Sequence, residues 1–513
     1  MSCICAKGGE EEKEEAKKDD DADSPTPDSS DDDAAIKMVF RRHSLKIYYK
    51  QMSMEKGDSN EGYDDDGRVK RTGTLISASA HIITAVIGSG VLSLAWCFGQ
   101  LGWIAGTASL MVFAVITWFT CLLLSDCYRS PDPVTGTRNY NYMQAVKANL
   151  GGLQYKLCGI AQYGILIGAT IGYTITAAIS MAAIERSNCF HKSGHHKGCH
   201  TLNNSYLLIF AIIEIVLSQI PNFHKLSLVS IVATIMSFTY ATIGIALSIA
   251  KIAEGGHART SLTGIPVGKD MASVDKMWTT FSAIGDIAFA YSFCPVLLEI
   301  QDTLRSSPPE NKVMKKASTV GVSASTLFYI ICGTLGYAAF GNDAPGNYLT
   351  GFGFYEPFWL IDFGNLCIVI HLLGAYQVYI QPFFAFVENW SKEKWPQNKF
   401  ITREYSLGKY KINVYRLTWR SGYVVLATLV AMIFPFFNSF LGLIGAATFW
   451  PLTVYFPIEM YITKAKIKKY SFTWIWMKVL SLACLTVSLV AAAGSIRGLI
   501  VSVETFKIFD SVS

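Results

Sequence analysis

The apolar stretch AVIGSGVLSLAW, residues 85–96, carries two glycines and a serine near its middle. Glycines that serve close packing between helices are usually four residues apart, so that both fall on one face. Gly88 and Gly90 are two apart and point to different faces, so an interruption of the helix explains them better than packing does. A helix that begins after the interruption would leave the N–H groups of Ser89, Gly90 and Val91 unpaired, and such groups bind carboxylates.

The stretch AYSFCP, residues 290–295, is a second candidate interruption. Pro295 lacks a backbone N–H group and clashes with the preceding turn, so the helix should kink or unwind there. Two such interruptions predict a binding site near the bilayer midplane, because unpaired backbone groups are tolerated only where they face protein or a wet cavity. A zwitterion suits this site: its carboxylate would meet the helix that begins near Gly90, and its ammonium the carbonyls near Ile87 and Ala290.

Small and aromatic side chains are expected to shape the pocket around the substrate's own side chain. Tyr291 and Phe293 lie in the second interruption, and Tyr163 lies in a neighbouring apolar segment. The complete predicted substrate-binding set is Ile87, Gly88, Ser89, Gly90, Val91, Tyr163, Ala290, Tyr291, Ser292 and Phe293.

Ionisable side chains inside apolar segments are costly and are therefore functional candidates. The candidates are His81, Glu214, Asp286, Asp362 and His371, whereas Lys and Arg are nearly absent from these segments. A proton-coupled carrier needs a group that changes charge during its cycle, and we predict that Asp286, His81 and His371 do so. Glu214 and Asp362 lie nearer the segment ends and are interpreted as neutral, hydrogen-bonded packing residues.

The elements that must position these residues are long apolar segments. The chain has 513 residues, of which 51% are hydrophobic and 16% charged, against about 25% charged in ordinary soluble domains. Long runs rich in Gly, Ala and Ser without strict alternation favour an all-α polytopic membrane bundle over a β-barrel. Eleven transmembrane helices are predicted at approximately 74–98, 102–127, 155–184, 205–220, 226–250, 277–300, 317–340, 357–387, 414–434, 436–462 and 474–496.

The distribution of Lys and Arg predicts the orientation. The connections 128–154, 221–225, 301–316, 388–413 and 463–473 hold 18 of the 44, whereas the loop 185–204 holds three and the loop 341–356 none. With an odd number of spans, the N-terminus is expected in the cytoplasm and the C-terminus outside.

The loop 185–204 supports this orientation. Cys189 and Cys199 would face an oxidising space, where a disulfide is expected. The four histidines of this loop also suggest zinc, but their spacing fits no known ligand set, and no metal site is predicted. Asn203 opens a glycosylation sequon whose use stays open.

The spans form two groups of five and one extra, so the groups are expected to be inverted copies whose first helices are both broken. The predicted parts are a disordered acidic tail (1–70), a first repeat (71–250), an extracellular connection (251–273), a second repeat (274–462), and an eleventh helix with the C-terminus (463–513).

Three stretches resemble the plant amino acid permeases of the amino acid/auxin permease family. They are RTGTLISASAHIITAVIGSGVLSLAWCFGQLGWIAG, GDIAFAYSFCPVLLEIQDTLRSSPPENKVMKKAS and WLIDFGNLCIVIHLLGAYQVYIQPFFAFVE. The resemblance runs from about Arg71 to the end of the eleventh span and implies a LeuT-like fold of five plus five helices with one added. It also implies that Ile87 to Leu92 receive the substrate carboxylate, that Phe289 to Ser292 offer carbonyls to the ammonium, and that His81 and His371 are the family's two histidines. The sequence differs from the family pattern at FCP, residues 293–295, and this difference bears on which substrates are selected.

The expected function is proton-coupled import of amino acids across the plasma membrane. The protein would be a carrier embedded in the lipid bilayer rather than an enzyme, with amino acids and protons as its partners. No cofactor and no nucleic acid is expected, and the oligomeric state is left open. A sodium site, an auxin-like carboxylate importer of the same fold, and an amino acid sensor that signals through its tail are the alternatives.

Overall fold

The computed structural model describes residues 64, 67, 70–194, 199, 203–219, 227–255, 258–268, 271–352, 357–407 and 410–505. The predicted acidic tail, the connection 221–225 and three of the four loop histidines lie almost entirely outside the described residues. Residues from Lys70 onward form one compact unit.

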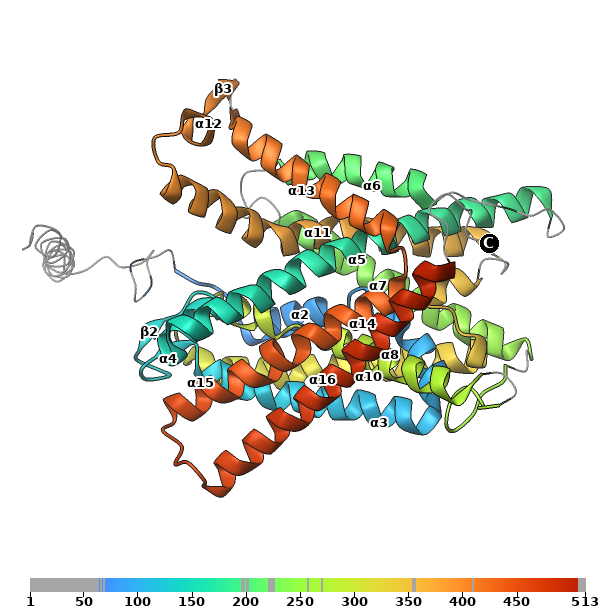
Figure 1. Ribbon diagram of the computed structural model, residues 1–513, viewed down its shortest axis with the longest axis horizontal. Coiled ribbons are helices and arrows are strands. Elements are labelled where there is room, and N and C mark those ends of the chain that lie inside the picture. The colour runs from blue at the N-terminus through green and yellow to red at the C-terminus, as the bar shows by residue number, and fades with distance from the viewer. Residues whose placement is uncertain are drawn as a thin grey trace, which may run out of the picture. The chain divides into compact units, whose positions relative to one another are not determined.

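Helices make up nearly all of this unit (Figure 1). In chain order they are α2 (Leu75–Val86), α3 (Gly90–Asp126), α4 (Tyr142–Leu150), α5 (Gly152–Ser193), α6 (Asn203–Ser218), α7 (Ser227–Ala253), α8 (Ser273–Ala290), α9 (Leu297–Gln301), α10 (Glu310–Phe340), α11 (Phe358–Lys394), α12 (Lys399–Thr402), α13 (Val414–Ile433), α14 (Phe437–Thr448), α15 (Phe456–Lys464) and α16 (Phe472–Thr505). Shorter helical turns are η2 (Cys294–Val296), η3 (Gly341–Asp343), η4 (Tyr348–Phe352) and the π-helical η5 (Phe449–Tyr455).

Two small antiparallel hairpins connect helices. Strand β1 (Arg129–Ser130) pairs with β2 (Thr137–Arg138), with Arg129 opposite Arg138. Strand β3 (Tyr405–Leu407) pairs with β4 (Tyr410–Ile412), with Tyr405 opposite Ile412.

Every predicted span corresponds to helical structure, but the boundaries differ. The first span is divided between α2 and the beginning of α3, and α3 continues through the second span after a turn at Gly102, where φ is 77°. Spans six and ten are each composite, formed by α8 with α9 and by α14 with α15. Within the described residues, eight helical segments are long and apolar enough to cross a membrane by length and composition. The all-α polytopic prediction is confirmed.

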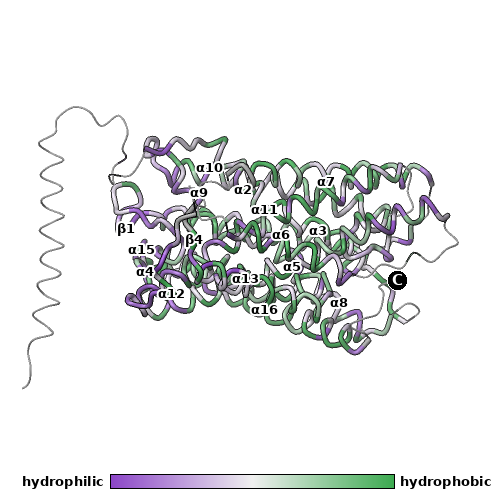
Figure 2. The backbone as a smooth tube through the Cα atoms, turned by 90° about the horizontal axis from the view of Figure 1, so that it is seen from above, coloured by the Kyte–Doolittle hydropathy of each residue, from purple (hydrophilic) through white to green (hydrophobic). Residues whose placement is uncertain are grey.

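The hydropathy of the chain changes along the helices. Figure 2 shows apolar residues along the helix middles and hydrophilic residues gathered where elements end, around β1, α4, α12 and α15. Apolar side chains such as Ile212, Val216 and Leu489 are exposed on α6 and α16. In a membrane these outward faces would contact lipid.

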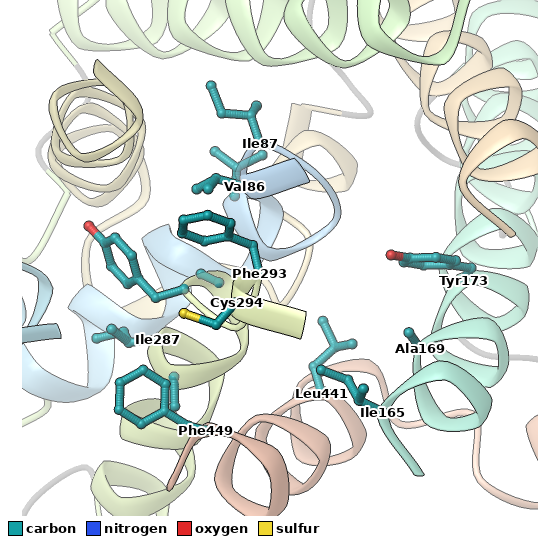
Figure 3. Packing of buried hydrophobic residues seen from close by; sticks show 14 of the residues in the cluster. Val86, Ile87, Ile165, Ala169, Tyr173, Ile287, Phe293, Cys294, Leu441 and Phe449 are labelled. Carbon is teal, nitrogen blue, oxygen red and sulfur yellow. The ribbon is translucent and has the colours of Figure 1, made fainter. Parts of the chain in front are cut away.

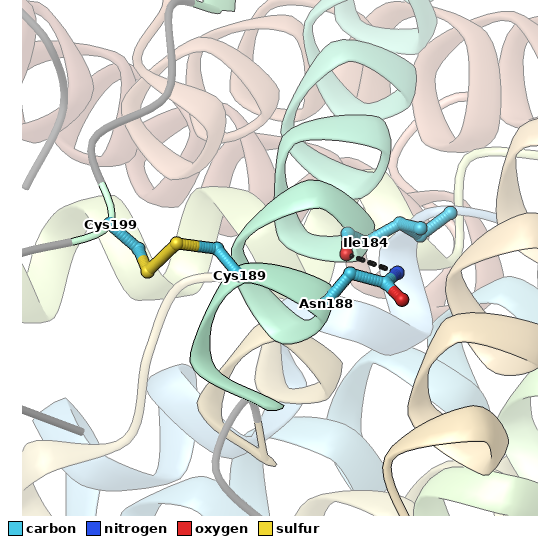
Figure 4. The surroundings of a disulfide bond; sticks show 4 residues. All are labelled: Ile184, Asn188, Cys189 and Cys199. Atoms are coloured by element: carbon cyan, nitrogen blue, oxygen red, sulfur yellow. Dashed lines mark hydrogen bonds between the residues drawn. A yellow bond between two sulfur atoms is a disulfide. The ribbon is translucent and has the colours of Figure 1, made fainter. Parts of the chain in front are cut away.

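The predicted outer loop begins later than expected, because α5 continues to Ser193. Within its last turns the Asn188 side-chain amide donates to the Ile184 carbonyl at 2.9 Å. A disulfide joins Cys189, in this part of α5, to Cys199 (Figure 4). Asn203, the first residue of the sequon, is also the first residue of α6.

Replacing Cys189 by serine is expected to lower the free energy of unfolding by about 2–4 kcal/mol, because the cross-link restricts the unfolded chain. The measurement is the thermal unfolding midpoint of the detergent-solubilised protein. The double replacement of Cys189 and Cys199 is the control, since it should be no less stable than either single variant. Equal unfolding midpoints for the wild type and the variants would contradict the prediction.

Candidate substrate site

The first interruption lies where the sequence places it. Helix α2 begins with a capping box between Thr74 and Ser77 and ends at Val86. Ile87 leaves the helical conformation, with φ −78° and ψ 86°. The Gly88 N–H group then donates to the Val86 carbonyl at 2.9 Å, and α3 begins at Gly90. The backbone is therefore unwound over about one turn.

Buried tyrosines satisfy the carbonyls that the first interruption frees. The Tyr240 hydroxyl of α7 donates to the Gly88 carbonyl at 2.9 Å. The Tyr329 hydroxyl of α10 lies within hydrogen-bond reach of the Val86 carbonyl and 3.1 Å from the Ala290 carbonyl. Because Tyr329 contacts carbonyls of both interruptions, it fixes them relative to each other.

The second interruption separates α8 from α9. Helix α8 ends at Ala290, and the following N–H groups make short-range bonds: Ser292 N–H donates to the Phe289 carbonyl at 3.0 Å, and Phe293 N–H to the Tyr291 carbonyl at 3.0 Å. The Ser292 hydroxyl turns back to the Ala288 carbonyl at 2.7 Å. The chain resumes helical structure with η2, which contains Pro295, as the missing N–H predicts.

The two interruptions contact each other at Gly90 and Ala290. A Cβ atom at Gly90 would lie 2.9 Å from the Cα atom of Ala290, closer than side chains pack. Only glycine therefore permits this approach. A Cβ atom at Gly88, by contrast, would have the Nε2 atom of His371 as its nearest neighbour, at an ordinary 3.8 Å.

A cavity of about 360 Å³, its open mouth included, lies between the interruptions and the helices α5 and α11. Its lining residues are Ala85, Val86, Gly88, Ser89, Gly90, Ile165, Tyr173, Phe289, Ala290, Ser292, Phe293 and Tyr379. In Figure 3 the side chain of Tyr173 points toward the interruption marked by Phe293.

The chemistry of the cavity is polar but uncharged. None of its lining residues is Asp, Glu, Lys or Arg. The Ser89 hydroxyl is buried and, in the described part of the chain, has no hydrogen-bond partner. It lies beside the N–H groups of Ser89 and Gly90, where a carboxylate is favoured. The Val91 N–H group, which the sequence predicts to be unpaired, donates instead to the Gly88 carbonyl at 3.4 Å. A ligand with one negative and one positive group would meet the positive end of the α3 dipole with its negative group and the negative end of the α8 dipole with its positive group.

Most of the predicted substrate-binding residues come together here. Six of the ten line the cavity, namely Gly88, Ser89, Gly90, Ala290, Ser292 and Phe293. Ile87, Val91 and Tyr291 are buried but do not line it.

Tyr163 lies elsewhere, with its ring against Phe383 and Phe386 of α11 at centroid distances of 5.6 and 4.5 Å. Ten residues along α5, Tyr173 lines the cavity instead, beside Ile165. Sequence reasoning missed Tyr173 and Tyr379 as well as the supporting Tyr240 and Tyr329. The available signal was the presence of hydroxyls in apolar segments, since a buried tyrosine usually hydrogen-bonds through its O–H group.

The three proton-coupling candidates have different surroundings. Asp286 is fully buried, and its Oδ1 atom has no hydrogen-bond partner within the described residues, while its Oδ2 atom is 4.0 Å from the Cys97 sulfur. His371 lies behind the first interruption, with Nδ1 2.8 Å from the Ala233 carbonyl and its ring edge toward Tyr240. His81 is exposed on the face of α2 that points away from the core, and it does not line the cavity.

The two predicted packing residues are hydrogen-bonded. Asp362 accepts a bond from the Asn188 side chain at 2.8 Å, and Glu214 accepts one from Gln377 at 2.6 Å. Among the described residues, no group of three or more His, Cys, Asp or Glu side chains is arranged to hold a metal ion.

Replacing Tyr329 by phenylalanine is expected to raise the KM for uptake about tenfold. The substitution removes the hydroxyl shared by the two interruptions and leaves a buried carbonyl unpaired, which costs about 1–3 kcal/mol. The control is Tyr348→Phe, which removes a buried tyrosine bond to the Ala241 carbonyl away from the cavity. An unchanged KM in Tyr329→Phe would show that this hydroxyl does not organise the site.

Known transporters share the sequence pattern of this chain. The family model described as "Transmembrane amino acid transporter protein" matches residues 71–501. The chain belongs to this family. Two relatives from Arabidopsis thaliana are amino acid permease 6, 65% identical over 464 residues, and amino acid permease 1, 63% identical over 457 residues. The alignments cover 89% and 88% of this chain and 96% and 94% of the relatives.

Membership makes this chain an amino acid transporter that crosses the membrane several times, and not an enzyme. Solved transporter structures share its fold at low sequence identity. The crystal structure of MhsT in complex with L-phenylalanine gives a TM-score of 0.50 at 11% identity, covering 84% of this chain and all of MhsT. The inward-facing conformation of Mhp1 gives a TM-score of 0.51 at 13% identity, covering 88% of this chain and 97% of Mhp1. The predicted LeuT-like fold is confirmed.

Proposed function

We propose that the transporter is a proton-coupled symporter that imports amino acids across the plasma membrane, with its N-terminus in the cytoplasm and its C-terminus outside. The observation that carries this proposal is the cavity between the two interruptions, which is lined both by the N-terminal end of α3, with the Ser89 hydroxyl, and by Ala290 at the C-terminal end of α8. An amino acid presents a carboxylate and an ammonium to these two helix ends.

Transport would proceed by alternating access. The spans that carry the interruptions, together with the second and seventh spans, would move as one bundle against the remaining scaffold. The cavity lies at the boundary, because Tyr173 and Ile165 belong to α5 and Tyr379 to α11, both in the scaffold. Opening either side of this boundary would expose the substrate to one side of the membrane.

Asp286 is the proposed proton carrier. It is buried one turn before the α8 interruption, and the Gly442 backbone of α14 approaches it so closely that a Cβ atom there would lie 2.9 Å from its Oδ1 atom. A carboxyl at the boundary between bundle and scaffold is placed to respond to their relative movement. His371, which contacts Tyr240 behind the first interruption, is the second candidate.

The experiment is amino-acid-evoked current in cells that express the transporter, measured across external pH and without sodium. A proton symporter gives inward current that grows as the external pH falls and persists without sodium. Current that requires sodium and ignores pH would contradict proton coupling and favour the sodium alternative.

Two other functions of the same fold are separable by experiment. An auxin-like importer needs no ammonium group, so neutral amino acids would fail to compete for its uptake. A sensor that signals through its tail would lose its function when residues 1–70 are removed, whereas the proposed symporter keeps full uptake.

A further inference from the structure

A buried chain of polar side chains crosses the scaffold between α6, α11 and α13, away from the cavity. We call it the α6–α11–α13 polar chain and define it as Glu214, Gln377, Gln381, Arg420 and Glu388. The Gln377 amide donates to Glu214 Oε2 at 2.6 Å, and the Gln381 amide donates to Gln377 Oε1 at 3.0 Å. Arg420 Nη1 lies 3.3 Å from Gln381 Oε1 and thereby continues the chain.

At one end of the polar chain a single carboxylate is paired with two guanidinium groups. Arg420 Nε donates to Glu388 Oε1 at 2.7 Å, and Arg416 lies 3.6 Å from the other oxygen of Glu388. Arg420 Nη1 also donates to the carbonyl of Ser218, the last residue of α6, at 2.7 Å. A cation at a helix C-terminus is favoured by the helix dipole. This end has the composition of a structural ion pair.

At the other end the carboxylate belongs to Glu214, and it has no ion-pair partner among the described residues. Glu214 is fully buried, its Oε2 atom accepts from Gln377, and its Oε1 atom has no hydrogen-bond partner in the described part of the chain. An ionised carboxylate with so few donors is costly in an apolar setting, and a protonated one would lack an acceptor for its O–H group.

The helices around α6 bring few titratable groups to Glu214. Helix α11 contributes Tyr376, which in turn has Tyr423 of α13 as a neighbour. Arg420 of α13 donates to the carbonyl of Ser218, one turn along α6 from Glu214. On α5 the carboxylate that bonds to α6 is Glu185, paired with the Tyr206 hydroxyl at 2.6 Å near the opposite end of α6. The charge of Glu214 is therefore compensated mainly through the Gln377 amide.

The polar chain is connected to the cavity through α11. Gln377 and Gln381 lie two residues before and after Tyr379, whose side chain lines the cavity. A second connection runs through α13, where the Tyr423 hydroxyl bonds to Thr170 of α5 at 2.7 Å. Thr170 lies between Ile165 and Tyr173, the α5 residues of the cavity wall.

We propose that Glu214 is a positioning residue that exchanges a proton during transport and thereby sets the placement of α11 and Tyr379 in the cavity wall. This inference rests on the proton-coupled transport proposed above. When Glu214 is charged, it holds the Gln377 amide strongly. When it is neutral, that bond weakens and the amide keeps its bond to the Ser218 hydroxyl of α6 at 2.9 Å, so α11 is held less firmly against α6. The proton moves between the carboxyl oxygen and water that enters during the cycle, and no other bond forms or breaks.

The test compares the KM for a neutral amino acid across external pH in the wild type and in Glu214→Gln, which keeps the size of the side chain but carries no proton to exchange. The wild-type KM is expected to change with pH, and in the variant this dependence should shrink by about fivefold or more, the lower end of usual couplings between sites. Glu214→Asp should restore it in part. The matched control is Glu185→Gln, which removes another carboxylate between α5 and α6 and should retain the wild-type profile.

A second variant, Gln377→Met, leaves Glu214 in place and removes the amide that donates to it. The midpoint of the KM profile should then move to higher pH, because the charged form has lost its stabilising bond. This readout holds even if Glu214→Gln does not reach the cell surface. A pH-dependent wild type with unchanged profiles in both variants would overturn the inference alone, whereas a wild type without pH dependence would overturn proton coupling as well.

Discussion

Gly90→Ala is expected to reduce amino acid uptake about tenfold to a hundredfold, with the protein still present in the membrane. The new Cβ atom would lie 2.9 Å from the Cα and 3.0 Å from the Cβ atom of Ala290. These two atoms of Ala290 are fixed by the backbone of the second interruption, so no side-chain rotation can move them away from the new Cβ atom. Overpacking of this kind costs about 1–3 kcal/mol, and here it would separate the two halves of the substrate site.

Gly88→Ala is the matched comparison, since it changes the same interruption. Its Cβ atom would meet only His371 Nε2 at 3.8 Å and would leave the contact between the interruptions intact, so uptake should fall less than in Gly90→Ala. Gly164→Ala, which has no neighbour within 4 Å, controls for the loss of a glycine in a membrane helix. The measurement is initial uptake of a labelled neutral amino acid, normalised to surface protein. Equal losses in Gly88→Ala and Gly90→Ala would mean that backbone freedom, and not the contact with Ala290, is what this segment requires.

The spans and both interruptions were predictable because they depend on local sequence. Apolar length determines which segments can cross a membrane, and Pro295 or a pair of glycines such as Gly88 and Gly90 interrupts a helix regardless of its neighbours. Boundaries were less predictable. Helix α5 continues past residue 184 to Ser193, since the polar residues there remain compatible with a helix.

The side chains that surround the interruptions were not predictable in the same way. In the apolar stretch of α5, 83% of the residues are buried, against 33% in the apolar stretch of α16. A helix buried on nearly all sides has no hydrophobic periodicity to distinguish the cavity face from the others. The sequence therefore could not favour Tyr173 over Tyr163, although the two lie on the same helix. The tyrosines that hold the free carbonyls come from α7 and α10, and only tertiary packing brings them there.

Whether an ionisable residue is buried depends on the face of the helix on which it lies. Helix α2 has a buried face formed by Ala78, Ile82 and Val86 at intervals of four. His81 lies off that face and is exposed, whereas the side chains of Asp286 and His371 are themselves buried. Whether a histidine lies on the buried face of its helix is thus a better indicator of a functional role than its presence in an apolar segment. Of the three proton-coupling candidates, Asp286 has the surroundings in which a change of protonation has the largest consequence.

Asp286→Asn is expected to abolish proton-driven accumulation while leaving exchange of amino acids across the membrane. The asparagine has the size of the aspartate and fits the same space between Cys97 of α3 and Gly442 of α14. It cannot take up and release a proton, and Asp286 does not line the cavity, so substrate binding should persist. The measurement is uptake into vesicles with an imposed pH gradient, beside exchange against internal unlabelled substrate without a gradient.

Asp275→Asn is the control on the same helix, because Asp275 is exposed in the first turn of α8 and should behave as wild type. The pair of assays separates two explanations of a loss. A residue needed only for packing would reduce accumulation and exchange together, since both require the bundle to move against the scaffold. A residue that carries the proton would reduce accumulation alone, because exchange returns the carrier with substrate bound and needs no net proton movement. Accumulation at the wild-type level in Asp286→Asn would remove this carboxyl from the coupling mechanism and leave His371 as the residue to test.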